Sequence, residues 1–550
     1  MVTSGIWNTF TAFCFLGLFC FTFVHSELDA AQLDSDIASV LGCKTSPALA
    51  VSVVLDGKAV FSKGYGYSDL QKTIPTTNNT IFGIASLSKA FAATLLLKLL
   101  DRHNISLNTP VVDVLGKDFR FEDDLRTKYA TLEDLLSHRL GIPSNNNIRL
   151  DTNLTRANLP KRLRYLKATG GFRNSFFYSN LMYGVITYIA ERLGGKTWEE
   201  LVKEEIFTPL GMTSSDFTTI KDLKSRDVAK PIAVYGENNT FPVNTEFSRR
   251  WGLLCGSGCV MSTANDMIKW MHFHLTRGLD LQGRRIMDTK VMDPMYIPRN
   301  AFAGSSYKTF VRPRLPVTTS SGVYAMGWRR GYYRGYPIIT HTGSTFGYRA
   351  IMILIPDKKF GVFMVATGND DEYLFRVSLA NYVIDATLGF TPWLNASTFC
   401  SFPQPWFGRK VTKYKLPDSS TPYKKNVSTY LGFFTNKAFG NMEVYYNASL
   451  GRVVIRYGYG EWALYPIAGP PDSFYGKGMG IISVKHCHTF VFRSGKGAGD
   501  RTVKIEAMCF EMKLPPVFVR EGSVNSADSM LSFRTNTLAL IFAVITAYYI

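Results

Sequence analysis

The first 26 residues contain no Lys, Arg, Asp or Glu, although the whole chain carries a formal net charge of +19. Basic residues nowhere form a run of five and only 19% of all residues are charged, so the sequence has no basic stripe of the kind that tracks nucleic acid. We therefore expect no nucleic-acid partner, and the positive charge favours solubility or attraction to an anionic surface instead. No repeat of solenoid length is visible either, which excludes a repeat architecture.

Histidine and cysteine are scarce, with 8 of each in 550 residues. The segments Cys255-Gly-Ser-Gly-Cys259 and His486-Cys-His488 contain metal-binding residue types, but neither repeats a paired ligand spacing. His272 and His274 fall in an apolar helical stretch. Zinc binding is therefore the weaker interpretation, and we expect neither a metal nor another cofactor.

Both ends of the chain are apolar. Phe10 to Val24 precedes the small residue Ser26, a pattern typical of a secretory signal cleaved near Glu27. An uncleaved membrane anchor is the alternative, because the leader has only the amino terminus as a positive charge. The tail Thr537–Ile550 is shorter than the ~20 residues that cross a bilayer as a helix. Together with small residues and a polar spacer before it, the tail is typical of a GPI-attachment signal, with Asn525 as the expected attachment residue.

Other features indicate a secreted or cell-surface glycoprotein that sits against an anionic membrane through its lipid anchor. The cysteines outside the leader form an even set, which in an oxidising compartment favours disulfides, although the sequence does not choose a pairing. These cysteines are Cys43, Cys255, Cys259, Cys400, Cys487 and Cys509. Acceptor triplets for N-glycosylation begin at Asn78, Asn104, Asn153, Asn238, Asn395, Asn426 and Asn447.

Hydrophobic periodicity predicts strands, then helices, then strands. Alternation from Ala48 to Gly66 around Asp56-Gly57 predicts a β-hairpin, and this order implies a sheet whose sequence ends meet across a helical insertion. Capping-box spacings begin at Thr131, Thr197 and Thr263. The other predicted elements are helices at Ser86–His103, Leu181–Leu193 and Glu372–Leu388 and strands at Tyr336–Gly343, Tyr348–Ile355 and Lys359–Thr367.

The C-terminal part of the sequence has a different pattern of predicted elements. Between Tyr430 and Arg520 short strands rich in Tyr, Phe and Val alternate with glycines and no helix is predicted, which indicates a separate all-β domain. We expect a signal peptide at 1–26, an α+β domain at 27–390, a proline-rich linker at 391–425, an all-β domain at 426–520 and a removed attachment signal at 526–550.

Three motifs in order carry the predicted chemistry. Ser86-Leu-Ser-Lys89 places a serine and a lysine three residues apart, on one face of a helix, where a desolvated lysine can take the serine proton. This pattern alone is weak, since about two matches are expected by chance in a chain of this length. Tyr178-Ser-Asn180 follows just before a predicted helix, and His341-Thr-Gly343 ends a predicted strand.

Together these motifs resemble the serine beta-lactamase and D-Ala-D-Ala peptidase superfamily, in particular its class C branch and the animal beta-lactamase-like proteins. The resemblance covers roughly residues 40 to 390, and it implies an antiparallel sheet flanked by helices with a helical subdomain. The C-terminal all-β domain is similar to the lipocalin-like barrel of some serine peptidases of this superfamily. The match rests on Tyr430-Leu-Gly-Phe-Phe434 and the glycine spacing after it.

The resemblance implies a role for each motif residue. Ser86 is the implied acylated nucleophile, Lys89 and Tyr178 share the acid and base work, and Asn180 orients the substrate and Lys89. The backbone N–H groups of Ser86 and Ser344 form the implied oxyanion hole. The implied substrate-binding residues on the strand are His341, Thr342 and Gly343.

His341 departs from the lactamases, which have lysine here. A histidine is only partly charged at pH 7, so we expect weak or no beta-lactam hydrolysis. Our first hypothesis is a serine hydrolase that acts through an acyl-enzyme on an ester, amide or small peptide. The alternative is a non-catalytic or self-assembling scaffold or binding protein that keeps the fold, and an oligomer is compatible with either hypothesis.

Overall fold

The computed structural model describes residues 28–41, 47–220, 226–235, 239–302, 315–370, 374–406, 421–495 and 501–522. The expected signal peptide, the attachment signal with Asn525, and Cys43 and Asn238 lie outside these residues. Among the described helices, none has both the length and the apolar character needed to cross a membrane.

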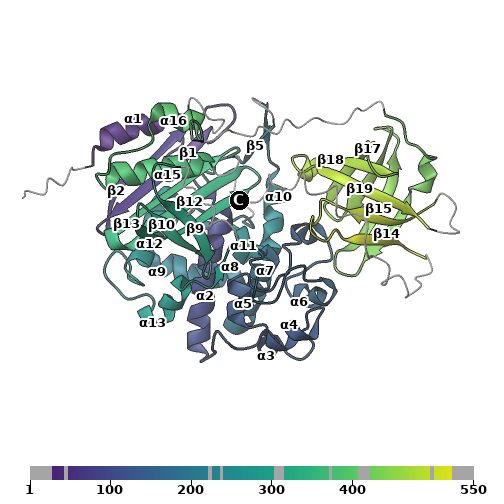
Figure 1. The fold of residues 1–550 in the computed structure, drawn as a ribbon, viewed down its shortest axis with the longest axis horizontal. Coiled ribbons are helices and arrows are strands. Elements are labelled where there is room, and N and C mark those ends of the chain that lie inside the picture. The colour runs from purple at the N-terminus through teal and green to yellow at the C-terminus, as the bar shows by residue number, and fades with distance from the viewer. Residues whose placement is uncertain are drawn as a thin grey trace, which may run out of the picture.

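An eight-stranded antiparallel sheet forms the centre of the N-terminal domain, in the order β2-β1-β13-β12-β11-β10-β9-β8 (Figure 1). Strand β1 (Ala48–Leu55) pairs with β13 (Phe360–Thr367), so the two ends of the domain meet in the sheet and the predicted order is confirmed. Asp56 and Gly57 both have positive φ, 48° and 78°, as a two-residue type I′ hairpin turn requires. The other strands of this sheet are β2 (Lys58–Gly66), β8 (Asn300–Ala301), β9 (Thr319–Tyr324), β10 (Arg329–Tyr333), β11 (Tyr336–Thr345) and β12 (Tyr348–Ile355).

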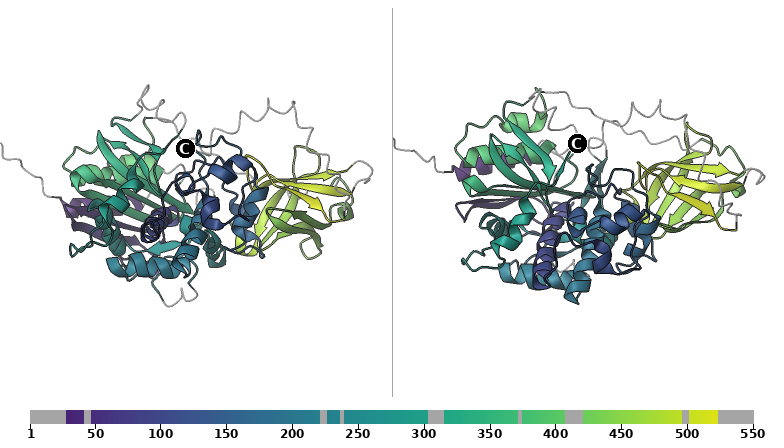
Figure 2. Two further views of the ribbon diagram at one scale, coloured as in Figure 1. Left: turned by 90° about the horizontal axis from the view of Figure 1, so that it is seen from below. Right: turned by 60° about the horizontal axis from the view of Figure 1, so that its bottom comes forward.

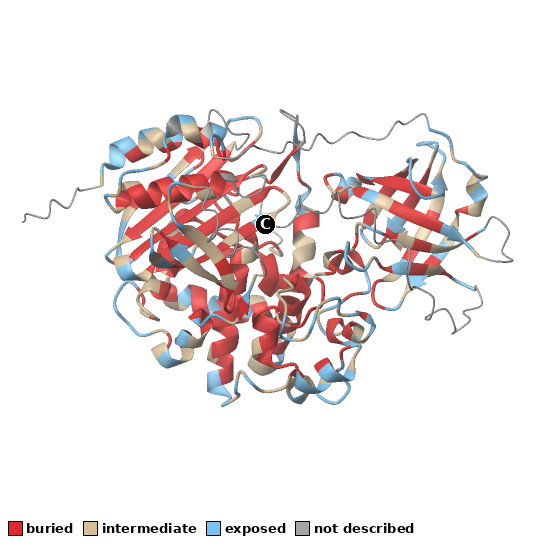
Figure 3. Cartoon of the chain, in the orientation of Figure 1, coloured by how far each residue is buried: buried red, intermediate tan, exposed pale blue. Residues whose placement is uncertain are grey.

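Helices cover both faces of the sheet, which explains why its central strands are apolar throughout. Ala48 and Ala50 of β1 pack into the core shared with α2 (Ser88–Arg102) and α12 (Ala264–Leu275). The alternate residues Leu49 and Val51 pack into a second core, on the face covered by α1 (Ala30–Leu41), α15 (Leu374–Thr387) and α16 (Ala396–Ser401) (Figures 1 and 3). Burial of a side chain as large as that of Leu49 or Val51 stabilises the fold by about 1.5–3 kcal/mol.

Most of the helices come between strands β2 and β8 in the sequence. In space this helical part lies beside the barrel (Figure 2). Thr131 and Thr197 begin capping boxes as predicted, but Thr263 has only half of one, because Asp266 accepts hydrogen bonds from Ser214 and Ser215 instead. The remaining α-helices are α3 (Val111–Leu115), α4 (Asp124–Tyr129), α5 (Leu132–Leu136), α6 (Leu159–Arg162), α7 (Asn180–Gly194), α8 (Trp198–Val202), α9 (Thr208–Leu210), α10 (Thr245–Arg249), α11 (Cys255–Gly258) and α13 (Thr289–Met292).

Part of the expected linker at 391–425 belongs to the core instead. Residues 396–401 form α16, and Leu394, Phe399 and Phe402 are buried against the sheet's second core. Prolines 403 and 405 follow this helix, as proline-terminated helices allow, and the segment 407–420 lies outside the described residues. The prolines of this region therefore mark the end of helix α16 in addition to a connecting segment.

The C-terminal residues form a closed antiparallel barrel of strands β14 to β21, as the all-β pattern predicted. Aromatic side chains from successive strands, including Trp462, Phe490, Phe510 and Phe518, are buried inside it. Closure leaves the barrel without free sheet edges. The strands are β14 (Gly432–Asn436), β15 (Gly440–Asn447), β16 (Arg452–Tyr457), β17 (Gly460–Pro466), β18 (Ser473–Met479), β19 (Cys487–Ser494), β20 (Thr502–Ala507) and β21 (Val517–Arg520).

The barrel docks on the segment that follows α5. The Tyr459 N–H donates to the Leu150 carbonyl oxygen at 2.9 Å, and a Cβ on Gly458 would lie 1.9 Å from that same oxygen. Asn147 Nδ2 donates to the Cys509 carbonyl at 3.2 Å, and the Asn145 N–H donates to the Glu511 carboxylate at 3.2 Å. The barrel therefore holds residues 145–150 from outside.

Candidate active site

Ser86 lies in a tight turn between β3 (Phe82–Gly83) and α2. The sequence predicts Ser86 in the first turn of an α-helix, but this is wrong: Ala85–Leu87 is a 3₁₀ turn (η1), and the α-helix begins at Ser88. Ala85 has a φ of 48°, a left-handed conformation that costs a non-glycine residue of order 1–3 kcal/mol. Ser88 Oγ holds the turn, since it donates to the Ala85 carbonyl at 2.7 Å and accepts the Val260 N–H at 3.0 Å.

Lys89 lies directly beneath Ser86 and is fully buried. Its Nζ is 3.2 Å from Ser86 Oγ, 2.7 Å from Asn180 Oδ1 and 2.8 Å from the Ser257 carbonyl oxygen. Burial, and secondarily the positive charge of Arg329, lower the pKa of Lys89 well below its ordinary value. In its neutral form the amine would direct its two hydrogens to Asn180 and Ser257, which would leave its lone pair for the Ser86 hydroxyl proton.

Tyr178 completes the group around the serine. Its hydroxyl donates to Ser86 Oγ at 2.8 Å, and its ring centroid lies 4.6 Å from Lys89 Nζ. His138 positions this segment: its ring centroid is 4.5 Å from that of Tyr178, and its Nδ1 accepts the Ser179 N–H at 3.1 Å. The three side chains that the sequence proposed as catalytic are thus in mutual contact.

Asn180, the first residue of α7, has its amide fixed from both sides. Oδ1 accepts from Lys89, and Nδ2 donates to Asn146 Oδ1 at 3.0 Å. Asn146 was not predicted from the sequence, because the run Asn145-Asn146-Asn147 contains nothing that indicates a contact with Asn180. The barrel holds both neighbours of Asn146, so the orientation of Asn180 depends on a segment that both domains fix.

We expect Asn146→Ala to lower kcat by about 10- to 100-fold with little change in KM, because a small misplacement of catalytic groups has a cost of this size. Rotation of the freed Asn180 amide would remove one acceptor of the Lys89 amine. The measurement is steady-state hydrolysis of an activated ester, with Asn108→Ala, an exposed asparagine before α3, as the control. Wild-type kcat in folded Asn146→Ala would contradict this role.

His341, Thr342, Gly343 and Ser344 lie on β11, next to the serine turn. Pairing of β11 with β10 ends at Thr340, opposite Arg329, so the edge from His341 to Thr345 has no strand partner on that side among the described residues. A Cβ on Gly343 would lie 2.2 Å from the Ile84 carbonyl oxygen, which shows how closely the strand approaches the turn. Ser344 is exposed, and an extended substrate could pair with this free edge.

We expect Gly343→Ala to slow acylation of Ser86 by about 100-fold, because the added methyl group must push β11 away from the turn. The same crowding should cost about 1–3 kcal/mol of stability. The rate of labelling by an active-serine probe measures the first effect and urea unfolding the second. Labelling within twofold of wild type would show that the contact does not set the site geometry.

His341 is buried and uncharged. Because a carbonyl only accepts, Nδ1 carries the proton and donates to the Thr342 carbonyl at 2.7 Å, while Nε2 accepts from the Tyr324 hydroxyl at 3.1 Å. Burial, then the charges of Arg329 and Lys89, lower the pKa of His341 well below its ordinary value. The position that carries a lysine in the lactamases therefore holds a neutral ring in this protein.

Arg329 is a cation of the site that no sequence motif marks. Its charge acts on Lys89, His138 and His341, and it lies one strand position before the free edge begins. We expect Arg329→Gln to raise the pKa of Lys89, because a nearby positive charge disfavours the ammonium form. The acid limb of the pH–rate profile should then move to higher pH, whereas the control Arg330→Gln should leave it in place. An unmoved limb in Arg329→Gln would contradict this assignment.

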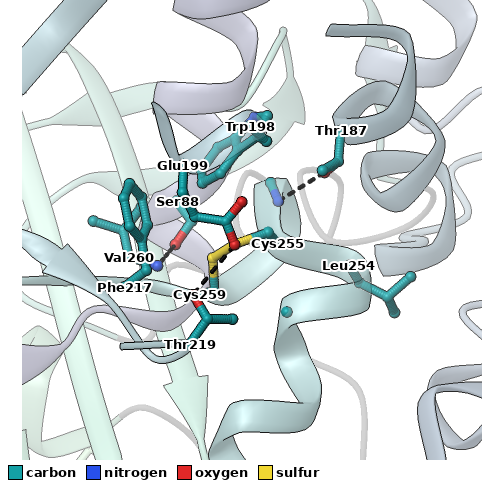
Figure 4. Close-up of a disulfide and its surroundings, with 12 residues drawn as sticks. Ser88, Thr187, Trp198, Glu199, Phe217, Thr219, Leu254, Cys255, Cys259 and Val260 are labelled. Atoms are coloured by element: carbon teal, nitrogen blue, oxygen red, sulfur yellow. Dashed lines mark hydrogen bonds between the residues drawn. A yellow bond between two sulfur atoms is a disulfide. The ribbon is translucent and has the colours of Figure 1, made fainter. Parts of the chain in front are cut away.

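Two disulfides lie in the described residues, Cys255–Cys259 and Cys487–Cys509. The first disulfide joins the two ends of the segment whose Ser257 carbonyl accepts from Lys89. Figure 4 shows this disulfide next to Glu199, and the hydroxyls of Thr187 and Ser88 accept from the N–H groups of Gly256 and Val260. These cysteines are therefore not free to bind zinc. Within the described ranges, no three His, Cys, Asp or Glu side chains are placed together so that they could hold a metal ion.

The sheet, the helical subdomain and the serine–lysine turn together define a beta-lactamase-type α+β fold. The chain belongs to the beta-lactamase family, whose model, described as Beta-lactamase, matches residues 34–381. The fold class expected from the motifs is confirmed.

Two relatives illustrate the range of the family. Gigasin-6 of Magallana gigas is 39% identical over 235 residues, which cover 42% of this chain and 77% of the relative. The unguisins hydrolase ungD of Aspergillus violaceofuscus is 26% identical over 449 residues, covering 77% of this chain and 79% of the relative.

Solved structures share the fold at low sequence identity. An octameric penicillin-binding protein homologue from Pyrococcus abyssi has a TM-score of 0.56 at 21% identity and covers 89% of this chain and 100% of its own. A class C beta-lactamase mutant has a TM-score of 0.51 at 19% identity and covers 65% of this chain and 98% of its own.

Proposed function

We propose that the protein is a serine hydrolase that forms an acyl-enzyme on Ser86. The observation that carries the proposal is the contact of Ser86 Oγ with both a buried lysine at 3.2 Å and a tyrosine hydroxyl at 2.8 Å. A serine becomes nucleophilic when an adjacent base takes its proton, and a neutral amine in a buried site is such a base.

The steps follow from these contacts. As Oγ bonds to the substrate carbonyl carbon, its proton passes to Lys89 Nζ, and the negative charge on the carbonyl oxygen is stabilised by the N–H groups of Ser86 and Ser344. The bond to the leaving group then breaks as that group takes a proton from the Tyr178 hydroxyl, which is replenished from the Lys89 ammonium. Water repeats the sequence in reverse and releases the acid.

The substrate class that we propose is an ester, an amide or a small peptide. The free β11 edge supports an extended substrate, and the similarity to the unguisins hydrolase ungD of Aspergillus violaceofuscus supports hydrolysis. The neutral, buried His341 supplies no fixed ammonium for a beta-lactam carboxylate, so beta-lactam turnover should be weak or absent.

We further propose that the protein works in an oxidising, extracellular compartment, secreted or held at an anionic membrane surface by a lipid anchor. The two disulfides favour this compartment. The acceptors Asn104, Asn153, Asn395 and Asn426 are exposed, whereas Asn78 and Asn447 are half-buried. The octameric structural neighbour supports an oligomer, which light scattering after size exclusion would measure.

A fluorophosphonate probe tests the proposed function. We expect one covalent adduct per chain on the folded protein, located by peptide mass spectrometry at Ser86, and none after heat denaturation. No adduct on well-folded protein would overturn the proposal and favour a scaffold or binding protein that keeps the fold without the chemistry.

A further inference from the structure

Arg149 is a buried cation to which the described residues offer no acceptor for Nε or Nη1. It lies in the 3₁₀ turn η2 (Asn146–Leu150) and is 1% exposed. Its guanidinium stacks between Phe247 and Trp251, with its central carbon 4.6 and 4.5 Å from the ring centroids. Nε and Nη1 have no hydrogen-bond partner, and no carboxylate of the described chain pairs with the group. An unpaired buried cation is costly, so such a group calls for an anion from outside.

Lys485 is a second cation beside it, contributed by the barrel. It lies between the turn η10 (Gly480–Ile482) and β19, and its Nζ is 5.7 Å from the centroid of the Phe346 ring. No ion pair of its ammonium occurs in the described residues. Burial and the charge of Arg149 lower the pKa of Lys485 to about 7. The neighbouring Arg250 is already paired, with Glu246 at 3.1 Å.

This pair adjoins the active-site edge. Trp251, on which Arg149 stacks, donates its Nε1–H to Thr345 Oγ1 at 3.2 Å, and Thr345 follows Ser344. Phe346, beneath Lys485, packs on Phe247 with a ring-centroid distance of 5.1 Å. The two cations therefore lie at the Thr345 end of the free β11 edge, opposite the end that begins beside Arg329.

We propose that Arg149 and Lys485 form an anion-binding subsite that receives a carboxylate carried by the substrate at the Thr345 end of the site. The inference rests on the proposed hydrolase function and adds its substrate class: acyl compounds with an acidic group. An arginine fork pairs with both oxygens of a carboxylate, and a lysine adds a point charge. Because the two residues come from different domains, the subsite exists only when the barrel is docked.

A matched pair of esters tests the subsite. Mono-4-nitrophenyl adipate and 4-nitrophenyl hexanoate have acyl chains of equal length that differ in a terminal carboxylate. We expect the ratio of their kcat/KM values, adipate over hexanoate, to fall about 10-fold or more in Arg149→Gln and in Lys485→Gln, the size of a lost charge-assisted bond. Hexanoate hydrolysis should stay within twofold of wild type in Lys485→Gln, which lies outside the 145–150 segment that positions Asn180. Lys477→Gln, an exposed lysine of β18, is the matched control.

Direct binding separates this inference from the proposed function. In the Ser86→Ala background, adipate should bind by calorimetry at constant ionic strength, and Lys485→Gln should weaken that binding about 10-fold or more. If neither ester is turned over by the wild type, the hydrolase proposal fails while adipate binding still decides the subsite. An unchanged kcat/KM ratio and an unchanged adipate affinity in Lys485→Gln would overturn the subsite, even where Arg149→Gln fails to fold.

Discussion

Replacing Ser86 by alanine should lower turnover by at least about 10⁴-fold, the largest effect that we expect from any single substitution. Ser86 Oγ accepts a hydrogen bond from the Tyr178 hydroxyl at 2.8 Å and lies 3.2 Å from the Lys89 amine, so its removal takes away the oxygen that both groups contact. The measurement is kcat/KM for an activated ester together with loss of the fluorophosphonate adduct.

The fold should survive this change, because Ser86 is only half-buried and Ser88, not Ser86, bonds the turn to Val260. The melting temperature checks this point, and Ser39→Ala, an exposed serine of α1, serves as the matched control. Turnover that persists in Ser86→Ala would show that the serine is not the nucleophile, whatever the geometry around it.

Replacing Lys89 by methionine should lower the acylation rate by about 10²–10⁴-fold, the range of a lost general base. Methionine fills the buried space but cannot accept a proton. Lys89→Arg should be equally impaired, because a guanidinium does not give up its proton in a protein. We expect melting temperatures near that of the wild type, because the lost desolvation cost of the amine offsets the loss of its bonds to Asn180 and Ser257. Full activity of Lys89→Arg would exclude a neutral amine as the base.

The pH dependence has a definite sign. The folded pKa of Lys89 is lowered by burial and by Arg329, and the neutral amine is the active form, so acylation should fall as the pH drops through that pKa.

In the unfolded chain Lys89 binds a proton at pH values where the folded form does not, so its contribution to stability should rise with pH up to the ordinary lysine pKa. Urea unfolding of wild type and Lys89→Met at two pH values measures this, and equal pH slopes would contradict the assignment.

Local patterns predicted much of the fold. The Asp56-Gly57 turn, the strands of β11 to β13 and the two capping boxes at Thr131 and Thr197 depend on residues near one another in sequence, and each is present. The start of α2 could not be predicted in this way. Ser88 Oγ accepts from Val260, 172 residues later, and donates to the carbonyl of Ala85, whose φ of 48° no local preference favours.

The residues of the candidate site were likewise predictable from the sequence only in part. Motif residues identified Ser86, Lys89, Tyr178, Asn180 and the His341–Gly343 strand, because their chemistry is recognisable in order along the chain. Asn146, Arg329, Arg149 and Lys485 carry no such motif, and their importance appears only from what lies beside them.

The sequence by itself determined that this chain has the beta-lactamase-type fold with a C-terminal β domain, and which serine, lysine and tyrosine belong together. Only the tertiary structure decided that burial lowers the pKa of the catalytic lysine, that burial lowers the pKa of His341, and that the barrel places Lys485 near Arg149, whose Nε and Nη1 have no acceptor among the described residues. Burial and the field of distant charges set these properties, and both depend on residues that the chain brings together only when it folds.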